Sequence, residues 1–374
     1  MSSESEQVRE SAVLAPVLGD TAGLIAFAAD VTETLRYDDG MYCFDRQWDA
    51  ASNRGRSHRY TLMVALGFSR AAASGYSVPR TALALADVAL AQCEEFTAGD
   101  KGLALWLLAR LGDQRAVALV GELSAVSDES LRPLEGMEIA WLVIGAAAAV
   151  ESGLEAGALL DRFLAVLRSR RAASTPLYHH LGTDARRAHL PNFATQIYSV
   201  LALADVGRIT NDAVALADSR RLADLLVELR GPQAAWPWLF HAEKGTVVET
   251  YQVYSVHQDA MAPMAYFALA EATGDDAYAR AGAEGLAWCF GANELGFQFH
   301  DSTRRFAHRA IKRGGWADRA ELWLNTAAGI SGIERRVRLG EAVVNTTCRP
   351  YHLGWILEAW AGREVHARHV GGPK

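Results

Sequence analysis

Residues 134–149, LEGMEIAWLVIGAAAA, begin with two acidic side chains and continue as a nearly unbroken apolar segment. Apolar residues would occupy every side of a helix formed here, and a helix that is hydrophobic all round must be enclosed by other elements. The apolar run spans only residues 139–150, whereas a membrane span needs roughly 20 residues. The segment therefore predicts a buried helix of a soluble protein.

The same plan, a polar or aromatic cluster leading into an apolar helix, recurs along the chain. It is found at residues 57–71, 99–112, 190–207, 253–274 and 347–362. Amphipathic helices, which can cover an enclosed helix and face water, are predicted at residues 21–37, 80–96, 155–169, 211–229 and 276–291. This alternation predicts an all-α protein, a closed (α/α)6 toroid of inner and outer helices. An open helical solenoid is the competing arrangement.

Composition narrows the class of protein. We expect one domain over residues 1–374, with flexible tails at residues 1–12 and 365–374. Lys and Arg number 37 and Asp and Glu 44, and this net charge of −7 argues against a dedicated nucleic-acid binder. The N-terminus lacks a secretory pattern, and the cysteines are scattered without a CxxC pair, which favours a reducing cytoplasm. We expect a small-molecule or oligosaccharide substrate, no membrane span, and neither cofactor nor metal; the oligomeric state stays open.

Polar residues at the starts of the inner helices would face one mouth of the ring. Free N–H groups and the positive dipole ends of the helices also gather there. Capping favours Ser, Thr, Asp and Asn, and it does not explain Arg-Tyr, His-Gln or Tyr-His pairs. The sequence therefore predicts a binding pocket at the mouth. The residues in these places are Arg59, Tyr60, Glu135, Glu138, Asn192, Gln196, His257, Gln258, Asp259, Tyr351 and His352.

An insertion at residues 37–60 leads into the first inner helix. It carries Asp39 followed by Gly40, a strong turn signal. Asp39 is a candidate catalytic carboxylate, and its alternative role is to serve that turn alone.

A second insertion reads as a β-hairpin near residues 235–251, with a turn at residues 243–245. If His241 pairs with Thr246, then Trp238 lies opposite Glu249, and Trp236 shares their face. Aromatic faces stack on sugar rings, and a carboxylate accepts hydroxyl hydrogen bonds or transfers a proton. The hairpin therefore predicts a sugar site, unless its tryptophans are only a plug closing the ring.

The hairpin leads directly into Tyr254, and three hydrogen-bonding side chains follow at residues 257–259. They fan around the first helical turn, so at most two can face the same cavity. His257 or Asp259 could bind a ligand or transfer a proton. Both could also be structural. A third polar patch, at residues 287–309, is predicted to be loop; it includes Asn293, Glu294, His300, Asp301 and Arg309, and an Asp301–arginine pair there could gate the mouth.

With these features, the chain resembles the six-hairpin (α/α)6-toroid enzymes that process glycans. That superfamily includes glycoside hydrolases, unsaturated glucuronyl hydrolases and sugar epimerases. The resemblance is carried by Trp236-Pro237-Trp238, by residues 254–259 and by the WCFGAN stretch at residues 288–293. It implies an enzyme of glycoside hydrolase, lyase or epimerase type that uses Asp or Glu pairs as acid and base.

On this hypothesis, Asp259 or Glu249 transfers the proton, and Asp39 or Glu138 supports charge or activates water. The side chains that would bind the substrate are Arg59, Tyr60, Gln196, Trp236, Trp238, Tyr254, His257, Gln258 and His352.

Three alternatives remain open at this point. A terpene-cyclase-like enzyme would use an aromatic cavity, although the chain lacks a D-x-D-D motif. A zinc site like that of the lanthionine cyclases would join Cys289, Cys348 and His352, although three residues separate the last two. A toroid could also bind a glycan or a partner protein without catalysis.

Overall fold

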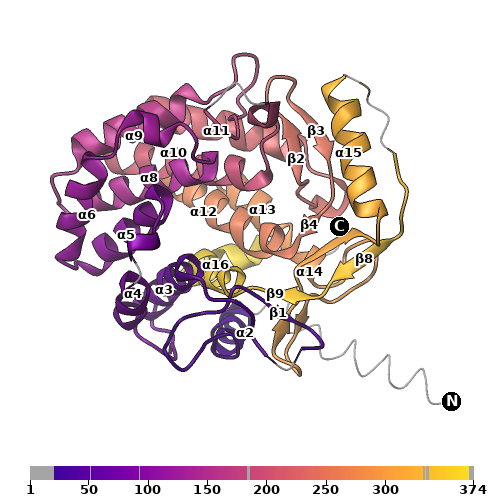
Figure 1. Cartoon of the computed structure of the whole chain (residues 1–374), viewed down its shortest axis with the longest axis horizontal. Helices are drawn as coiled ribbons and strands as arrows, with labels where there is room; N and C mark the ends of the chain where they lie inside the picture. The colour runs from indigo at the N-terminus through magenta and orange to yellow at the C-terminus, as the bar shows by residue number, and fades with distance from the viewer. Residues whose placement is uncertain are drawn as a thin grey trace.

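The computed structural model describes residues 21–50, 52–91, 93–182, 186–331, 333 and 337–369. In this part of the chain, six helices form a closed inner ring, in which each contacts the next and the last contacts the first (Figure 1). They are α3 (His58–Ala73), α5 (Ala98–Leu111), α8 (Gly136–Glu151), α10 (Phe193–Thr210), α12 (Ala262–Thr273) and α16 (Pro350–Trp360). The predicted (α/α)6 toroid is confirmed.

An outer layer of helices covers this ring, one on each inner helix. In the order α3, α5, α8, α10, α12 and α16, the covering helices are α4 (Ala82–Leu90), α6 (Arg115–Ser124), α9 (Gly157–Ser169), α11 (Ala213–Glu228), α13 (Asp276–Ala283) and α2 (Thr21–Glu33). The sequence analysis missed α6. Its buried residues, Ala116, Leu119 and Leu123, nevertheless follow the helical spacing.

Glycines let neighbouring inner helices approach closely. A Cβ atom added to Gly145 of α8 would lie 2.3 Å from the backbone oxygen of Gly102 in α5. A Cβ atom added to Gly67 of α3 would lie 2.2 Å from the backbone oxygen of Gly354 in α16. No side chain fits at either crossing, so these four glycines set the spacing of the ring at two of its six joints.

The predicted hairpin forms, with one change of register. Strands β2 (Leu239–His241) and β3 (Thr246–Glu249) are antiparallel, and His241 pairs with Thr246 as expected. A bulge between Leu239 and Phe240 then places Leu239, and not Trp238, opposite Glu249. The predicted pairing of Trp238 with Glu249 is therefore wrong, because one bulged residue shifts the register of the strands.

Residues 300–348 are more regular than the sequence suggested. Strands β4 (Val253–Tyr254), β7 (Ala310–Arg313) and β8 (Ala342–Asn345) form one sheet, and α15 (Ala317–Ile330) packs against β3. Two short ribbons join β1 (Arg46–Gln47) to β9 (Thr347–Cys348) and β5 (His300–Asp301) to β6 (Phe306–Ala307). The third polar patch is thus partly strand, which fixes the backbone around Arg309.

Short helical turns complete the chain. They are η1 (Cys93–Glu95), α7 (Asp128–Leu131), η2 (Arg186–His189), η3 (Pro232–Ala234), the π-helical turn η4 (His257–Met261), α14 (Leu286–Cys289) and η5 (Glu364–His369). In η5, His366 is buried against Phe267, so the flexible tail predicted from residue 365 does not begin there. Residues 1–12 and 370–374, the rest of the predicted tails, lie outside the described residues.

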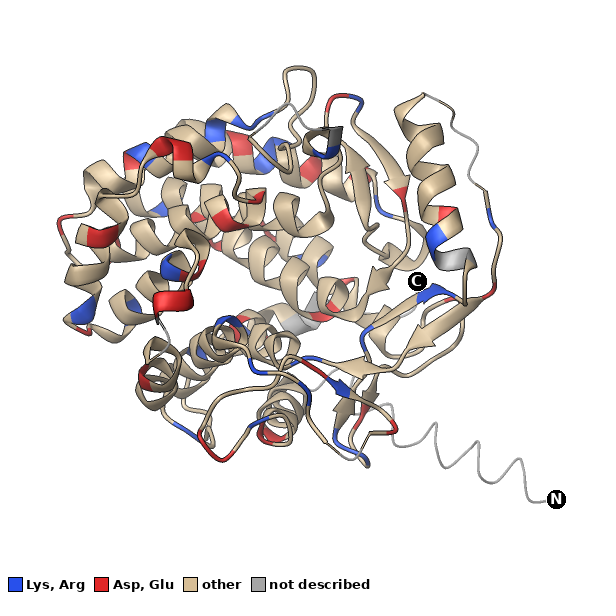
Figure 2. Ribbon diagram, viewed as in Figure 1, with Lys and Arg blue, Asp and Glu red and all other residues tan. Residues whose placement is uncertain are grey.

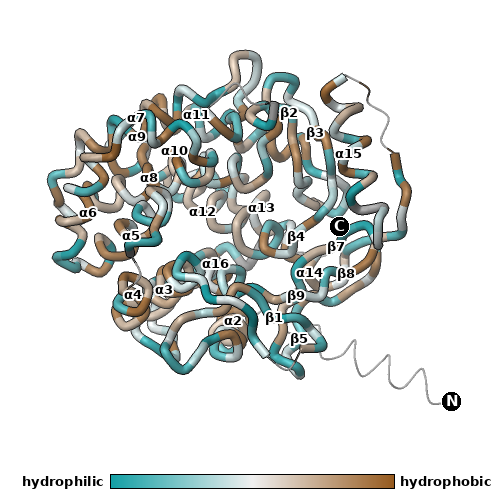
Figure 3. Tube along the Cα trace, in the orientation of Figure 1, coloured by the Kyte–Doolittle hydropathy of each residue, from teal (hydrophilic) through white to brown (hydrophobic). Residues whose placement is uncertain are grey.

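Charged and hydrophobic residues are both distributed along the whole described chain. Acidic and basic residues are interspersed along the ribbon (Figure 2), and hydrophobic stretches lie along helices of both layers (Figure 3). Among the described residues, no helix has the length and apolar character needed to cross a membrane.

Candidate active site at the mouth of the ring

The N-terminal ends of the six inner helices surround one cavity of about 600 Å³. Each inner helix contributes a side chain from its first turns or from the residues just before them, as the sequence predicted. The contributing residues include Ser57, His58, Arg59, Tyr60, Thr97, Asp100, Met137, Trp141, Asn192, Tyr198, Tyr254, His257, Met261 and Tyr351. Phe44, Glu95, Trp238 and Arg309 add to the wall from loops and strands. This volume is typical of sites for small ligands.

His257 lies in this wall and is 3% exposed. Its ring is parallel to that of Trp238, at 8° and 6.2 Å between centroids, and it also contacts Phe193 at 4.6 Å. Nδ1 is buried and has no hydrogen-bond partner among the described residues. Burial, and after it the nearby Arg309 guanidinium, lowers the pKa of His257 to about 3. The imidazole is therefore neutral at pH 7 and can accept a proton.

The π-helical turn η4 (His257–Met261) carries this histidine into α12. Tyr254, His257 and Met261 line the cavity, whereas Gln258 and Asp259 point away from it and are fully buried. Single π-helical turns within α-helices are often found at functional sites. Here the side chains on one face of the turn line the cavity, and those on the opposite face are buried inside the ring.

Asp259 lies on the interior face, 0% exposed. The Nε2 atoms of His300 and His352 each lie 2.8 Å from its carboxylate, and Cys289 Sγ lies 3.5 Å away. Burial would raise the pKa of Asp259, but the two imidazoles outweigh this effect and lower it to about 2. Asp259 is thus ionised beneath the cavity wall and does not line the cavity. This placement corrects the expectation that Asp259 faces the substrate, and it removes His352 from the mouth as well.

Arg59 is held in an acidic network at one side of the cavity. Its guanidinium lies 2.6 Å from Asp100 and 3.0 Å from Glu138, and its charge sits 5.2 Å from the centre of the Trp141 ring. Burial opposes the ionisation of Asp100, but hydrogen bonds from His58 and Arg59 keep its pKa below the usual range. Asp100 is therefore ionised, and its carboxylate is held by the hydrogen bonds of this network.

Glu138 has a structural task in the same network. It is the third residue of α8, and its carboxylate accepts hydrogen bonds from the Glu135 backbone N–H and from Arg59. The reciprocal arrangement is a capping box. Glu138 thus positions Arg59, and it is not among the residues that line the cavity.

Arg309 provides a positive charge that has no carboxylate partner in the described part of the chain. Nη1 of Arg309 is buried without a hydrogen-bond partner among the described residues, and the guanidinium lies over the Tyr254 ring at 4.9 Å. None of its ion pairs or hydrogen bonds in the described part of the chain involves a carboxylate. Burial lowers the pKa of Arg309, but Tyr351 and Tyr254 outweigh this effect and raise it. The guanidinium is therefore an uncompensated cation in the wall of the cavity.

The backbone around Arg309 is fixed by the three-stranded sheet. Its N–H donates to the Asn345 oxygen at 3.0 Å, and its own oxygen accepts from the Ser255 N–H at 2.9 Å. Strand β4 leads from this sheet into the turn that carries His257. The same sheet thus positions the cation and the histidine.

Aromatic side chains form the remaining wall. Tyr60 stacks with Phe44 at 5.5 Å and contacts Tyr351 at 4.8 Å, and its hydroxyl accepts a hydrogen bond from Arg349 at 2.9 Å. Burial, and after it Tyr351, raises the pKa of Tyr60 to about 12, so its hydroxyl stays protonated. Trp238 and Tyr254, 5.0 Å apart, continue the aromatic surface toward His257.

Three other predicted binding residues are buried in the ring. The Gln196 amide pairs with the backbone N–H and oxygen of Tyr178. The Gln258 amide accepts from the Trp236 N–H and donates to the Tyr254 oxygen. Trp236 is 0% exposed and stacks with Tyr266 at 5.4 Å. These placements correct the expectation that all three face the substrate, and they leave Trp238 as the tryptophan of the hairpin that lines the cavity.

The last two predicted carboxylates lie elsewhere. Glu249 borders a second cavity of about 240 Å³, which has Trp238 and Tyr254 in common with the main cavity. There its carboxylate accepts hydrogen bonds from Asn325 at 2.6 Å and from two backbone N–H groups. Asp39 is exposed in its turn, where it accepts from the Met41 N–H and pairs with Arg56. Of the four predicted catalytic carboxylates, none lines the main cavity, so the structure does not assemble the expected acid–base pair there.

Of the three predicted alternative zinc ligands, Cys289 and His352 both contact the Asp259 carboxylate, whereas Cys348 lies outside this group. Cys289 lies beside Asp259 and His300, and within the described residues this set does not extend to Cys348. Arg309 lines the cavity, although the sequence analysis considered it only as an ion-pair partner of Asp301. Its signal was weak, because the short strand that presents it has no clear alternation.

Comparison with known proteins agrees with this architecture. At the level of sequence, neither a protein-family model nor a curated protein matches the chain. Among solved structures, a sugar epimerase from a ruminal bacterium matches with a TM-score of 0.59 at 11% identity, over 94% of this chain and 97% of the other. The fold is that of the (α/α)6 toroid enzymes.

Two further structures support the same fold. The cellobiose 2-epimerase of Bacillus thermoamylovorans has a TM-score of 0.58 at 11% identity, over 89% of this chain and 95% of the other. A possible member of the GH105 family from Salmonella enterica serovar Paratyphi A has a TM-score of 0.59 at 12% identity, over 93% and 95%. At these identities the likeness shows the fold alone.

Proposed function

We propose that the chain is a carbohydrate-active enzyme of epimerase or isomerase type, which moves a proton at the carbon next to a sugar carbonyl. The observation that carries this proposal is the neutral His257 in the cavity wall beside the uncompensated Arg309. The substrate class is a free reducing sugar, either a monosaccharide or a short oligosaccharide.

The chemistry needs a base and a positive charge close together. His257 takes the proton from the carbon, and the electron pair of the C–H bond moves toward the carbonyl oxygen to give an enediolate. Arg309 stabilises that oxygen, because a fixed cation in a water-poor cavity favours developing negative charge. A proton delivered from water to the opposite face gives the epimer, and the proton taken by His257 passes to the solvent. Return of the proton from His257 to the neighbouring carbon, with transfer of the hydroxyl proton to the former carbonyl oxygen, gives the isomer.

Burial is the main cause of the low pKa of His257. Part of the lowering comes from Arg309, whose charge disfavours a protonated imidazole. A negative oxygen forming beside Arg309 offsets that charge, so His257 becomes more basic as the enediolate forms.

The rest of the cavity suits a sugar. Trp238, Tyr254, Tyr60 and Tyr351 offer flat apolar faces, and the Arg59–Asp100 pair offers hydrogen-bonding groups for hydroxyls. Two of the three structural neighbours are described as epimerases, which agrees with the class and does not identify a substrate.

The hydrolase and cyclase alternatives have less support. Glycoside hydrolysis needs two carboxyl groups on either side of the bond, but Asp100 is bound to Arg59 and Glu95 lies exposed at the rim. A terpene-type cavity would need a protonated acid, and Asp100 is held as an anion. Sugar binding without turnover is the alternative that the experiment below distinguishes from catalysis.

We propose a cytoplasmic location, because the cysteines are scattered along the chain without a CxxC pair.

The direct test is a product assay by NMR with a panel of free aldoses and reducing disaccharides. We expect the wild-type protein to convert at least one of them into its epimer or ketose. His257→Gln should reduce this conversion by at least about 100-fold, the usual contribution of a proton-transfer group. His241→Asn, which changes a half-buried histidine outside the cavity lining, should retain the activity. Sugar binding without conversion across the panel would contradict the proposal.

A further inference from the structure

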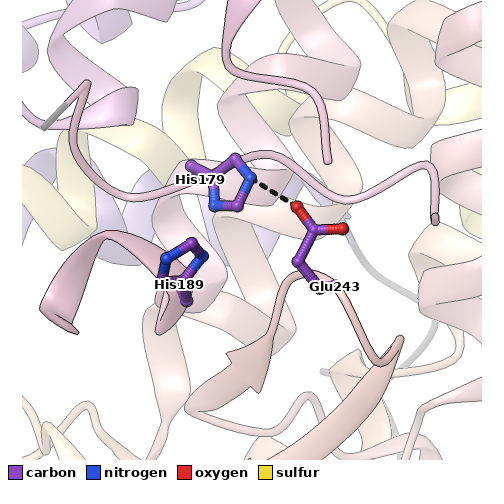
Figure 4. Close-up of side chains that lie close together, drawn as sticks. All are labelled: His179, His189 and Glu243. Atoms are coloured by element: carbon purple, nitrogen blue, oxygen red, sulfur yellow. Dashed lines mark hydrogen bonds and ion pairs between the residues drawn. The ribbon is translucent and has the colours of Figure 1, made fainter. Parts of the chain in front are cut away.

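A second group of ligating side chains lies away from the cavity. His179 follows α9, His189 ends the turn η2, and Glu243 lies in the turn between β2 and β3. Figure 4 shows the three side chains gathered from these separate segments. One nitrogen or oxygen from each lies within 4.8 Å of the others, and His179 Nε2 is 2.9 Å from Glu243 Oε1. None of the three lines the main cavity.

Backbone contacts hold this group in place. The Ala242 N–H donates to the His189 oxygen at 3.0 Å, and the Thr175 hydroxyl donates to the Ala242 oxygen at 2.5 Å. The Glu243 carboxylate also accepts from the backbone N–H groups of Ala173 and Ser174. The three ligating groups are thus brought together by contacts that do not depend on any bound ion, so a site would be largely preformed.

A hydrogen bond between His179 and Glu243 does not account for the whole group. His179 Nδ1 is buried and has no hydrogen-bond partner among the described residues. A buried polar atom without a partner needs an explanation, and an unseen ion is one of the common ones. His189 lies beside this pair with its ring 5.0 Å from that of His179, at 81°. Two imidazoles and a carboxylate are a typical donor set for a transition-metal ion.

We propose that His179, His189 and Glu243 bind a divalent first-row transition-metal ion, with Zn²⁺ as the best fit. A tetrahedral zinc ion with ligands at about 2.1 Å separates its donor atoms by roughly 3.4 Å, so side-chain shifts of about 1 Å would complete the site. His189 is exposed, which leaves the open side of the site to water.

The ion would join two segments that border the candidate active site. The loop before α10 continues to Asn192, and the hairpin strand β2 begins next to Trp238; both residues line the cavity. A metal ion that joins the loop before α10 to the β2–β3 hairpin would therefore stabilise the wall of the cavity to which both segments contribute. The proposal does not depend on the function proposed above.

The test is a titration of the metal-free protein with zinc chloride, followed by calorimetry and by thermal unfolding. We expect one zinc ion per chain and a rise in Tm on binding. His189→Ala and Glu243→Gln should each weaken binding at least tenfold and remove most of the rise in Tm. His58→Asn is the matched control, because it breaks another histidine–carboxylate contact, 3.5 Å from Asp100, without touching the three ligands.

The outcomes separate clearly. Retained binding in His58→Asn with loss in His189→Ala and Glu243→Gln supports the site. Absence of zinc binding by the wild-type protein, or equal binding by wild type and both ligand variants, would overturn the proposal. All of these readouts are independent of sugar turnover.

Discussion

The pairing of His257 with Arg309 carries most of the functional argument at the scale of single residues. One is a neutral base and the other an uncompensated cation, and both line the same cavity. Neither property can be derived from sequence alone, because the first depends on burial and on the nearby Arg309, and the second on which groups lie near Arg309 in the folded chain. The sequence indicated His257 as a candidate ligand and proton carrier, and it offered no means of seeing that Arg309 has no carboxylate partner among the described residues.

Replacement of Arg309 should change the titration of His257. In Arg309→Gln we expect the pKa of His257 to rise toward its usual value, since a neighbouring positive charge is removed. We also expect kcat to fall by about 100-fold, as for loss of a group that stabilises an oxyanion. NMR titration of the imidazole signals measures the first effect. Arg56→Gln, which removes a cavity arginine already paired with Asp39, should leave that titration unchanged.

Asp259 is expected to contribute to stability. Its pKa is lowered from 3.8 to about 2 in the folded chain, so its stabilisation is present above pH 3.8 and is lost as the pH falls through 2. Asp259→Asn should reduce the free energy of unfolding by about 1–3 kcal/mol at pH 7, because a buried network loses a charged acceptor. Urea unfolding at pH 7 and pH 3 measures this. An unchanged free energy at pH 7 would contradict the structural role.

At the scale of elements, the beginnings of the inner helices explain which site predictions failed. The sequence located these helix starts well, and the cavity lies where they meet. It could not give the rotation of each helix about its axis. Tyr351 faces the cavity and His352 does not. The π-helical turn likewise determines that His257 lines the cavity whereas Gln258 and Asp259 do not. A shift of one position along the helix therefore determines whether a side chain faces the cavity or is buried in the ring.

The crossings of inner helices provide a test at the same scale. Gly145→Ala should destabilise the protein by about 1–3 kcal/mol, because its Cβ would overlap the backbone of α5. Gly121→Ala is the control: Gly121 lies exposed in α6 with nothing within 4 Å of an added Cβ. That change should stabilise by about 0.5–1 kcal/mol through helix propensity. Thermal unfolding compares the two variants, and equal effects would show that the α5–α8 approach is not close.

The whole molecule was the most predictable level. The alternation of enclosed and amphipathic helices predicted the ring. In a closed ring, six apolar helices are buried against one another on the inside, and one amphipathic helix covers each of them on the outside. Non-local structure was the least predictable: β4, β7 and β8 pair residues from 253 to 345, and no local pattern encodes that pairing. That sheet nevertheless fixes Arg309 beside His257, so the part of the fold that sequence missed is the part on which the proposed chemistry depends.

The most direct test of the central claim is solvent exchange during turnover in D₂O. Proton transfer through His257 predicts that deuterium enters the product at the carbon that receives the proton, which is the carbon that lost its proton in an epimer and the neighbouring carbon in a ketose, as seen by NMR. His257→Gln should remove both the exchange and the product. Product formed without any deuterium at the carbon that receives the proton, or equal exchange in wild type and His257→Gln, would contradict the account.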